Sequence, residues 1–512
     1  MDKTEKTIIG KDVIESLTTS MYDDPRFVYR EYIQNSADAI DKARKQFADF
    51  QGNIFINIDT KNRKVEIEDD AIGIESDKVV AILKNIAQST KQKGVDKGFR
   101  GIGRLGGLGY CEKLIFETSA NGETEKSIMI WEAKKLKEII ADRTQKQEAS
   151  TVIDEVTIFK TESESVEKHY FKVILEGVAN DGLLDVKDIR QYLSMVAPVP
   201  FKTATLTPRI YENLKNENIC IDEYQIFVNT EQIYKGYKWY VYEGDEISSK
   251  KVDEVIDIAF FKENDKNGNP LFWGWYGVTS KIQSLQKINF ARGFRLRKTN
   301  IQIGNDDTLL KLHKDRRFQF YFFGEVYALH TDLHPNARRD YFSENDVCKE
   351  FELKLKNFFY TTIHKLCYDA SKINSAVKDI EKHNQTVQLF NEKQQNGFIN
   401  KKEKEDLERK LQQQEEAKKK AEQTIEKLKE NSDNPPITKI IEKATQKIGT
   451  EIKPIEIQEI ETPTKPIFRT DKLSRLNKSD RKFLGEIFTV INNVLTKDLA
   501  ENLIQKIEEK YK

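Results

Sequence analysis

One stretch near the amino terminus constrains the fold most, because it sorts its side chains into two chemically different faces. It reads FVYREYIQNSADAIDKAR and covers residues 27–44. At about 100° of rotation per residue in a helix, one face gathers polar side chains: Glu31, Asn35, Asp38 and Lys42. The opposite face gathers apolar ones: Tyr29, Ile33, Ala37 and Ile40. We predict a helix with a core-facing back and a front that is either solvated or part of a binding site.

A strand and turn that follow the helix carry groups suited to a purine base. Residues 65–74, VEIEDDAIGI, are typical of a strand that ends in acids and then turns at glycine. Asp69 can accept a hydrogen bond from the amino group of adenine, and Gly73 lets the backbone approach the base. We therefore expect Asp69 to be buried.

A third segment suits a polyphosphate. Residues 91–110, KQKGVDKGFRGIGRLGGLGY, combine many glycines with lysine and arginine. Backbone amides of such segments can surround phosphate oxygens while basic side chains offset their charge, although many glycine-rich segments are only turns. The predicted nucleotide contacts in this segment are Arg100, Gly103, Arg104, Gly106, Gly107 and Gly109.

The helix asparagine, the strand-end acid and the glycine-rich segment, in this order, resemble the N, G1 and G2 boxes of the GHKL ATPases. That superfamily includes gyrase, heat-shock chaperones, histidine kinases and MutL. REYIQNSADAIDKAR, residues 30–44, is similar to the matching helix of HtpG-type heat-shock chaperones. The resemblance implies an α+β fold with an amino-terminal GHKL (Bergerat) ATP-binding sandwich, and ATP and Mg²⁺ as ligands.

The same resemblance implies a role for each residue on the polar front. Glu31 becomes the general base that orients the attacking water, and Asn35 the ligand of the Mg²⁺ that bridges the phosphates. A carboxylate can take the proton of water, and an amide oxygen can complete the octahedral shell of Mg²⁺ without adding charge. Further nucleotide contacts are implied for Asp38, Ala39, Lys42, Asp69, Gly73 and Ile74.

The chain departs from the family pattern in two places. The G1 box, Asp-x-Gly-x-Gly in the family, reads Asp69-Asp70-Ala71-Ile72-Gly73. Ala71 adopts backbone conformations with negative φ, so the change concerns the detail of the loop more than binding. The G2 glycines fit Gly-x-x-Gly-x-Gly in more than one register, and residues 89–99 are shorter than the chaperone lid.

A second match lies in the middle of the chain. LHPNARRDYFSEN, residues 333–345, resembles the chaperone middle-domain segment in which Pro-x-Asn precedes a catalytic-loop arginine. Aligned in this way, Arg339 reaches the γ-phosphate, with Arg338 as the alternative, and a planar cation there offsets charge on the departing phosphoryl group. RGFRLRKTNIQIG, residues 292–304, could face nucleotide, partner or solvent and stays unassigned.

Changes in sequence pattern divide the chain into five predicted parts. They are a GHKL ATP-binding domain (1–185), an α+β middle, transducer-like domain (186–370), coiled-coil helices (371–431), an extended proline-containing linker (432–470) and a helical unit (471–512). The coil, paired within or between chains, is indicated by a heptad seam of Leu407, Leu411, Gln414, Lys418, Ala421, Ile425 and Leu428. The last unit, which can dock or dimerise, shows an apolar face of Phe483, Ile487, Val490, Ile491 and Val494.

Composition bears on the partners and the location of the protein more than on its activity. Lys+Arg and Asp+Glu both number 84, so net charge does not favour nucleic acid or an anionic membrane, although a local patch remains compatible. The 4 cysteines form no CxxC pair, and no long apolar run or signal-peptide layout is present. We expect a cytoplasmic protein without a membrane span.

Three outputs of an ATP-driven engine stay open. The first is a chaperone-like homodimeric clamp whose lid and domains close on ATP and reset on hydrolysis, with a client or partner protein that the sequence does not name. The second is a nucleic-acid clamp similar to MutL and MORC proteins, in bacterial genome maintenance or antiphage defence, with DNA-stimulated turnover. The third is a nucleotide sensor that binds ATP without turnover. All 6 histidines follow the ATP segments, which disfavours a histidine kinase.

Overall fold

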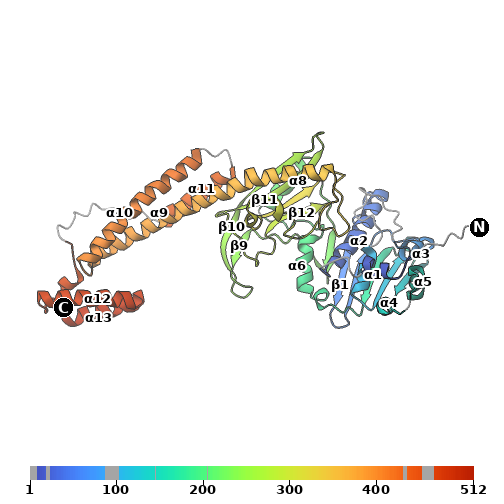
Figure 1. Ribbon diagram of the computed structural model, residues 1–512, viewed down its shortest axis with the longest axis horizontal. Helices are drawn as coiled ribbons and strands as arrows, with labels where there is room; N and C mark the ends of the chain where they lie inside the picture. Colours follow the sequence, from blue (N-terminus) through green and yellow to red (C-terminus); the bar gives the residue numbers. More distant parts are fainter. Residues whose placement is uncertain are drawn as a thin grey trace, which may run out of the picture. The chain divides into compact units, whose positions relative to one another are not determined.

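The computed structural model describes residues 8–18, 24–86, 103–144, 146–204, 206–430, 435–451 and 466–512. They belong to two compact units, Met1–Val278 with Ser284–Thr361, and Thr279–Gln283 with Thr362–Lys512. The first unit contains two sheets with helices, and the second is mainly helical (Figure 1). The α+β class predicted from the sequence is confirmed.

An eight-stranded sheet, in the order β5-β4-β3-β6-β2-β1-β7-β8, organises the amino-terminal part. Its strands are β1 (Asn53–Asp59), β2 (Lys64–Asp69), β3 (Lys113–Ser119), β4 (Glu125–Trp131), β5 (Thr157–Ser163), β6 (Tyr170–Glu176), β7 (Gln225–Val228) and β8 (Glu231–Gln232). Neighbouring strands run antiparallel except β1 and β7, which are parallel. β1 and β2 form an antiparallel hairpin, and the strand predicted to end in the acids of residues 68–70 is β2.

Alternation along β1 explains which face of this sheet is covered. Ile54, Ile56 and Ile58 are buried, whereas Phe55 and Asn57 between them are exposed, as expected for a strand with one core face. The central helix α2 (Phe27–Gln46) packs on β1 and β2. Its apolar back, predicted from the periodicity, is buried.

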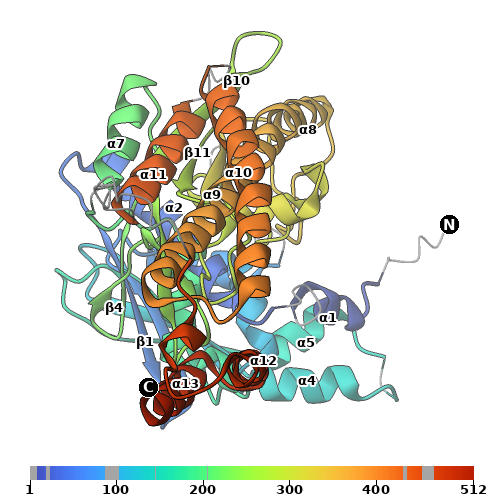
Figure 2. The ribbon, with the colours of Figure 1, turned by 90° about the vertical axis from the view of Figure 1, so that its left-hand side faces the viewer.

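Shorter helices complete the layer beside α2. They are α1 (Asp12–Thr18), α3 (Ser76–Lys84), the 3₁₀ segment η1 (Gly103–Gly109), α4 (Ala133–Ala141) and α5 (Ala149–Val156). α4 contacts β3 and α5, and α1 contacts η1 and α5 (Figure 2). These helices and α2 share one hydrophobic core with the inner face of the sheet.

The first sheet extends further along the sequence than the boundary predicted at residue 185. After η2 (Asp181–Leu183), α6 (Val186–Val196) and α7 (Thr207–Asn216), the chain returns to add β7 and β8 beside β1. The four-residue β7 lies far along the chain from β1, its parallel neighbour. The local sequence pattern therefore could not predict that the two strands pair. The sheet therefore continues to Gln232.

A six-stranded sheet, in the order β13-β12-β14-β11-β10-β9, forms the middle part. Its strands are β9 (Tyr240–Glu243), β10 (Lys250–Asn264), β11 (Pro270–Thr279), β12 (Gly293–Lys298), β13 (Ile301–Gln302) and β14 (Phe323–Ala328). Short 3₁₀ turns η3 (Leu310–Leu312) and η4 (Arg316–Tyr321) precede β14, and helix α8 (Asp346–Phe358) follows it. Aromatic side chains fill much of this core, including Trp273 and Trp275.

The basic residues left unassigned at 292–304 point into the protein. Arg297 is fully buried and forms an ion pair with Glu325. Arg295 donates to the carbonyl of Phe290 at 2.7 Å, and Lys298 donates to the carbonyl of His330 at 2.6 Å. Arg292 donates to Leu285 at 2.8 Å. These basic side chains therefore contact other groups of the protein interior.

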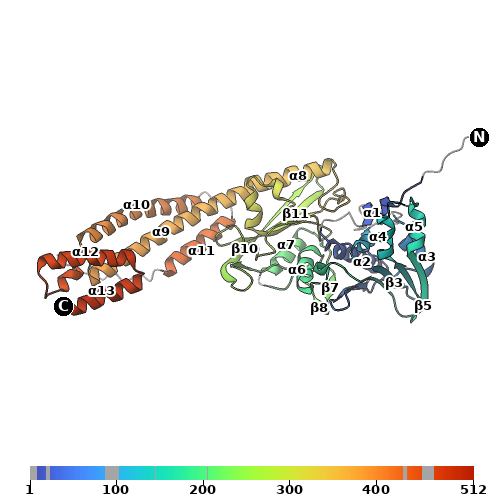
Figure 3. The same ribbon diagram turned by 60° about the horizontal axis from the view of Figure 1, so that its bottom comes forward.

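Long helices dominate the second unit (Figure 3). The π-helical turn η5 (Phe359–Ile363) leads into α9 (His364–Asn396), and α10 (Lys401–Glu430) packs along α9. Gly397, with φ of 100°, ends α9. At the start of α10, the Asn400 side chain accepts a hydrogen bond from the Glu403 amide, and the Glu403 side chain accepts one from the Ile399 amide. Every residue of the predicted heptad seam is buried or half-buried, so this coil pairs within the chain.

The extended linker predicted for 432–470 is wrong for residues 435–451. These form helix α11 (Pro435–Glu451), which packs on α9 and buries Ile437, Ile440 and Ile441. Proline at the first turn of a helix costs no hydrogen bond, because amides there have no helical acceptor. The two prolines at 435 and 436 therefore start a helix and do not mark a linker.

The carboxyl-terminal unit is a helix pair, α12 (Lys478–Val494) and α13 (Lys497–Tyr511), preceded by η6 (Arg469–Lys472). Its interior uses Phe488, Ile504 and Ile399. Most of the predicted apolar face of α12 lies outside this interior, since Phe483 is 63% and Val494 74% exposed. Across the described parts of the chain, no helix is long and apolar enough to cross a membrane.

Candidate nucleotide site

The polar front of α2 is largely enclosed, although the residues on it are charged. Glu31 is 5% and Asp38 3% exposed, while Asn35 and Ala39 are half-buried. Lys42, one turn further along, is exposed. Burying two carboxylates costs free energy unless they find partners, which makes this face a functional candidate.

Asp69 is the last residue of β2 and is completely buried. Its Oδ1 lies 3.3 Å from the Ala71 amide, whereas its Oδ2 has no hydrogen-bond partner among the described residues. Burial raises the pKa of Asp69 to about 7, and the Ser36 hydroxyl and the Ala71 amide offset part of that rise. The predicted burial is confirmed, and one carboxylate oxygen is left ready to accept a hydrogen bond.

The G1 turn after Asp69 accepts alanine at one position and requires glycine at another. Ala71 is buried and is not among the residues with positive φ, so a side chain fits there. Gly73 has φ of 70°, and a Cβ on it would overlap the carbonyl oxygen of Ser119. The next amide, of Ile74, donates to the Thr118 hydroxyl at 2.9 Å.

The described part of the glycine-rich segment, residues 103–109, forms a 3₁₀ helix, η1. The Tyr32 hydroxyl holds it to α2 by donating to the Arg104 carbonyl at 3.0 Å and accepting from the Gly107 amide at 3.1 Å. The predicted phosphate contact of the Gly107 amide is therefore not supported. Gly106 and Gly107 are buried, and Gly109 is half-buried.

Two residues at the start of η1 lie close to groups of the site. A Cβ on Gly103 would overlap Oε2 of Glu31, so this glycine packs directly against the carboxylate. Arg104 donates to the Asn85 carbonyl, and its Nε has no partner in the described chain. Desolvation lowers the pKa of Arg104 to about 10, which an anion beside it would reverse.

The middle-domain arginine reaches the amino-terminal helix. Arg339 Nε lies 2.9 Å from Glu31 Oε1, with the two side chains 12% and 7% exposed. Glu31 Oε1 accepts no aligned hydrogen bond from the described residues, so the contact is an ion pair without hydrogen-bond geometry. Arg338 is exposed, and Arg339 alone of the two candidates contacts Glu31.

The loop that presents Arg339 is held in an unusual backbone conformation. Arg339 has φ of 57°, in the left-handed region that non-glycine residues rarely adopt. Its carbonyl accepts from the Gly304 amide at 2.8 Å, and its amide donates to Asn336 at 3.2 Å. Backbone contacts on both sides therefore offset the local strain and fix where the guanidinium emerges.

The structure brings together some of the predicted residues and leaves others apart. Glu31, Gly103 and Arg339 meet around one carboxylate, and Asp69 faces Ser36 of the same helix. Lys42 and Arg338 are exposed away from these contacts. Arg100 and the lysines of residues 91–97 lie outside the described residues.

Sequence reasoning missed the residues that support the site. Tyr32 joins α2 to η1, and Thr118 holds the G1 turn. Both act through hydroxyl groups whose partners lie far along the chain, so spacing carried no signal for them. Gly103, though predicted, was assigned to phosphate and not to Glu31.

Comparison with known proteins defines the class of this site. Residues 24–162 match the family of histidine kinase-, DNA gyrase B- and HSP90-like ATPases. That range contains α2, the G1 turn and η1. The chain therefore contains an ATPase domain of the GHKL type.

Three relatives that share part of this chain are chaperone proteins HtpG. The chain is 27% identical over 308 residues to the chaperone protein HtpG of Wigglesworthia glossinidia brevipalpis, covering 55% of this chain and 43% of that protein. HtpG of Burkholderia ambifaria is 26% identical over 191 residues (32% and 29%), and HtpG of Buchnera aphidicola 28% over 171 (30% and 27%). The chain is distantly related to HtpG chaperones and spans less than half the length of these relatives.

Proposed function

We propose that this protein binds and hydrolyses ATP and works as a homodimeric molecular clamp of the HtpG type, closing its lid and domains on the nucleotide. The observation that carries the proposal is the ion pair between Glu31 and Arg339. It joins Glu31, the candidate general base, to Arg339, a cation from a loop beside the second sheet of the same unit. A general base and a planar cation at one point are what phosphoryl transfer to water requires.

Adenine recognition is assigned to Asp69. Its Oδ2 is a buried acceptor without a donor in the described chain, and the amino group of adenine supplies one. Gly73 lets the turn after Asp69 pack directly on the Ser119 carbonyl, which fixes the backbone beside this acceptor. Ile74, half-buried after the turn, contributes apolar contact.

Hydrolysis is assigned to the front of α2. Glu31 accepts the proton of the attacking water, and Gly103 beside it leaves the carboxylate room to turn towards that water. Arg339 offsets the charge that builds on the transferred phosphoryl group, and Arg104 contributes a second cation. Asn35, one turn after Glu31, offers the amide oxygen for Mg²⁺, which would neutralise charge on the phosphates.

We infer domain closure because residues beside two different sheets contribute to one site. Arg339 is held by Gly304 beside β13 of the second sheet, whereas Glu31 belongs to the helix that covers the first. A nucleotide that contacts both favours the arrangement in which they are close. The second chain of the dimer and the client or partner protein rest on the resemblance to HtpG chaperones.

The test is steady-state Mg-ATP hydrolysis by the wild type, Glu31→Ala and Arg339→Ala, with ATP binding measured for each. Glu31→Ala should bind ATP but lose roughly a hundredfold or more in turnover, the scale of a general base. Arg339→Ala should also bind and lose turnover, whereas Arg338→Ala, the neighbouring exposed arginine, should behave as wild type.

Other outcomes would redirect the assignment. Steep, salt-dependent stimulation by double-stranded DNA would favour a MutL/MORC-like nucleic-acid clamp. ATP binding without turnover in the wild type would favour a nucleotide sensor. Equal turnover in the wild type and Glu31→Ala would remove Glu31 as the base.

A further inference from the structure

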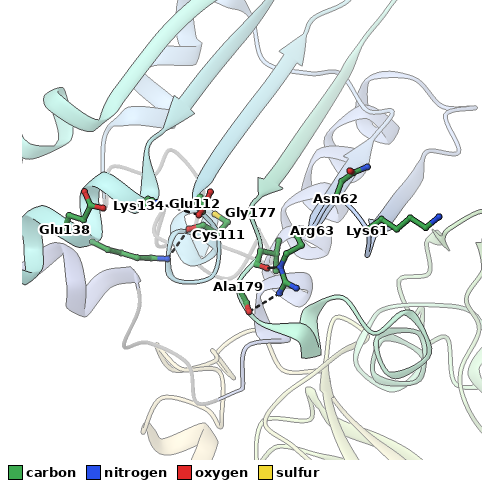
Figure 4. Close-up of a pocket in the computed structure, with 11 residues that line it drawn as sticks. Lys61, Asn62, Arg63, Cys111, Glu112, Lys134, Glu138, Gly177 and Ala179 are labelled. Atoms are coloured by element: carbon green, nitrogen blue, oxygen red, sulfur yellow. Dashed lines mark hydrogen bonds and ion pairs between the residues drawn. The ribbon is translucent and has the colours of Figure 1, made fainter.

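A second pocket lies at the end of the first sheet opposite Asp69. It has a volume of about 550 Å³ and is lined by the β1–β2 turn, the residues before β3, the residues after β6 and one side of α4 (Figure 4). β2 begins beside this pocket and ends at Asp69, five residue steps or about 16 Å away. The pocket is therefore separate from the candidate nucleotide site.

Basic side chains outnumber acidic ones in this pocket. Its lining includes four cations, Lys61, Arg63, Lys134 and Lys137, and two carboxylates, Glu112 and Glu138. The whole chain carries no net charge, so this excess of positive charge is local. An anion would be drawn to the pocket although the protein as a whole would not attract one.

Arg63 forms a fixed wall of the pocket. Its guanidinium donates to the carbonyls of Val178 at 2.6 Å and Ala179 at 3.1 Å, and the second of these bonds is drawn in Figure 4. It also pairs with Asp181 at 2.8 Å. Because these partners hold Nε and Nη2 of the guanidinium in place, Arg63 shapes the pocket, and the lysines of α4 are the cations that we assign to a ligand.

Lys137 is the cation on α4 that lacks an ion pair with any described residue. It is half-buried, its ammonium donates to the Cys111 carbonyl at 3.0 Å, and it makes no ion pair within the described chain. Burial lowers the pKa of Lys137. An ammonium has three donors, so two remain for a ligand.

Lys134 adds a second ammonium on the same side of α4. Residues three apart on a helix are neighbours, and two like charges at this spacing repel each other. The nearest carboxylate oxygen paired with Lys134 is that of Glu112, at 4.0 Å. An anion between Lys134 and Lys137 would remove the repulsion and supply Lys137 with a counter-charge.

The floor of the pocket is tied to the glycine segment. Cys111, whose carbonyl binds Lys137, also donates its thiol hydrogen to the Gly107 carbonyl, with 3.2 Å between sulfur and oxygen. Burial raises the pKa of the Cys111 thiol to about 12, so the thiol keeps the hydrogen that this bond needs. A ligand bound by Lys137 would therefore touch the residue that supports Gly107.

From this geometry we propose that the pocket binds a small, multiply charged oxyanion of the phosphate class, held by Lys137 and Lys134. Side chains make the recognition, because the amides of Glu112, Val178 and Ala179 are already bonded to backbone carbonyls. The volume admits a ligand larger than inorganic phosphate.

The test is calorimetric titration of the full chain with inorganic pyrophosphate at saturating ADP, which occupies the nucleotide site. Wild type should bind, and Lys137→Gln should bind at least about tenfold more weakly, as expected when a direct cation contact is lost. Lys137→Arg, which keeps the charge, should retain binding and show that the position tolerates substitution.

Lys135→Gln is the matched control. Lys135 lies on the same helix, pairs with Glu155 and is not part of the pocket, so its loss removes one charge without removing a side chain of the pocket. Equal weakening by Lys135→Gln and Lys137→Gln, or no binding by the wild type, would overturn the proposal. A parallel titration with citrate separates phosphate from carboxylate ligands, and tighter binding of citrate would overturn the phosphate class.

Discussion

Two buried polar clusters in the first unit differ in how completely they are satisfied. At the middle sheet, Arg297 of β12, Glu325 of β14 and Lys235 from the segment before β9 are fully enclosed, and Glu325 is paired with both cations. Tyr327 donates to the same carboxylate at 2.5 Å. In the amino-terminal sheet, Asp69 is equally enclosed but keeps one oxygen without a partner.

The two carboxylates respond to burial in opposite directions. The neighbouring Arg297 and Lys235 outweigh desolvation and lower the pKa of Glu325 to about 2, whereas no cation offsets desolvation at Asp69 and its pKa rises to about 7. Burial alone therefore does not separate structure from function. A closed network stabilises the fold, and an open one retains a place for a ligand.

The largest effect is expected from opening the closed cluster. Glu325→Gln leaves two buried cations without their counter-charge and should lower the free energy of unfolding by about 3–5 kcal/mol. Urea unfolding measures it. The control is Glu66→Gln, which removes a partly exposed partner of Lys64 and should cost less than about 1 kcal/mol. Similar small losses in both variants would contradict the difference between the clusters.

Neutralising Asp69, the carboxylate of the open cluster, should change the free energy of unfolding in the opposite direction. Because the folded pKa of Asp69 lies above its unfolded value, its contribution favours folding at low pH and is lost as the pH rises through about 7. Asp69→Asn should therefore stabilise the ligand-free protein by about 2–4 kcal/mol at pH 8 and by less at pH 5. Urea unfolding at both pH values tests this, and destabilisation at pH 8 would contradict it.

A smaller effect is expected from crowding the base. Gly103→Ala would place a methyl group against Oε2 of Glu31, and a displaced base should lower ATP turnover by about tenfold or more while ATP affinity stays near wild type. Gly10→Ala is the control, since a Cβ there meets no atom within 4 Å. Unchanged turnover in Gly103→Ala would separate Gly103 from the catalytic group.

Sequence reasoning succeeded where a local pattern carries the physics. The period of α2 predicted its buried back, and the pattern of residues 65–74 predicted the strand that ends at Asp69. The burial of Asp69 was expected from the adenine contact that its place at the end of a strand suggested. These features depend on residues that are close in the chain.

Features that depend on distant residues escaped prediction. The pairing of β7 with β1 moved the end of the first sheet past residue 185, and the Tyr32 hydroxyl took the Gly107 amide that was expected to face phosphate. The prolines at 435 and 436 led to the wrong prediction of a linker, because proline breaks a helix in its interior but is tolerated in its first turn. The preference for Arg339 over Arg338 required the three-dimensional contact with Glu31.

Calorimetric titration of ATP into the wild type and Asp69→Asn tests most directly the claim that the open cluster is a nucleotide site. If the amide oxygen keeps the hydrogen bond from the Ala71 amide, its NH2 group replaces Oδ2 and faces the amino group of adenine, so two donors oppose each other. Asp69→Asn should therefore remain folded and bind ATP roughly a hundredfold or more weakly than the wild type. Equal ATP affinity in the two proteins would contradict the account, because the unpartnered oxygen of Asp69 would then have no part in binding.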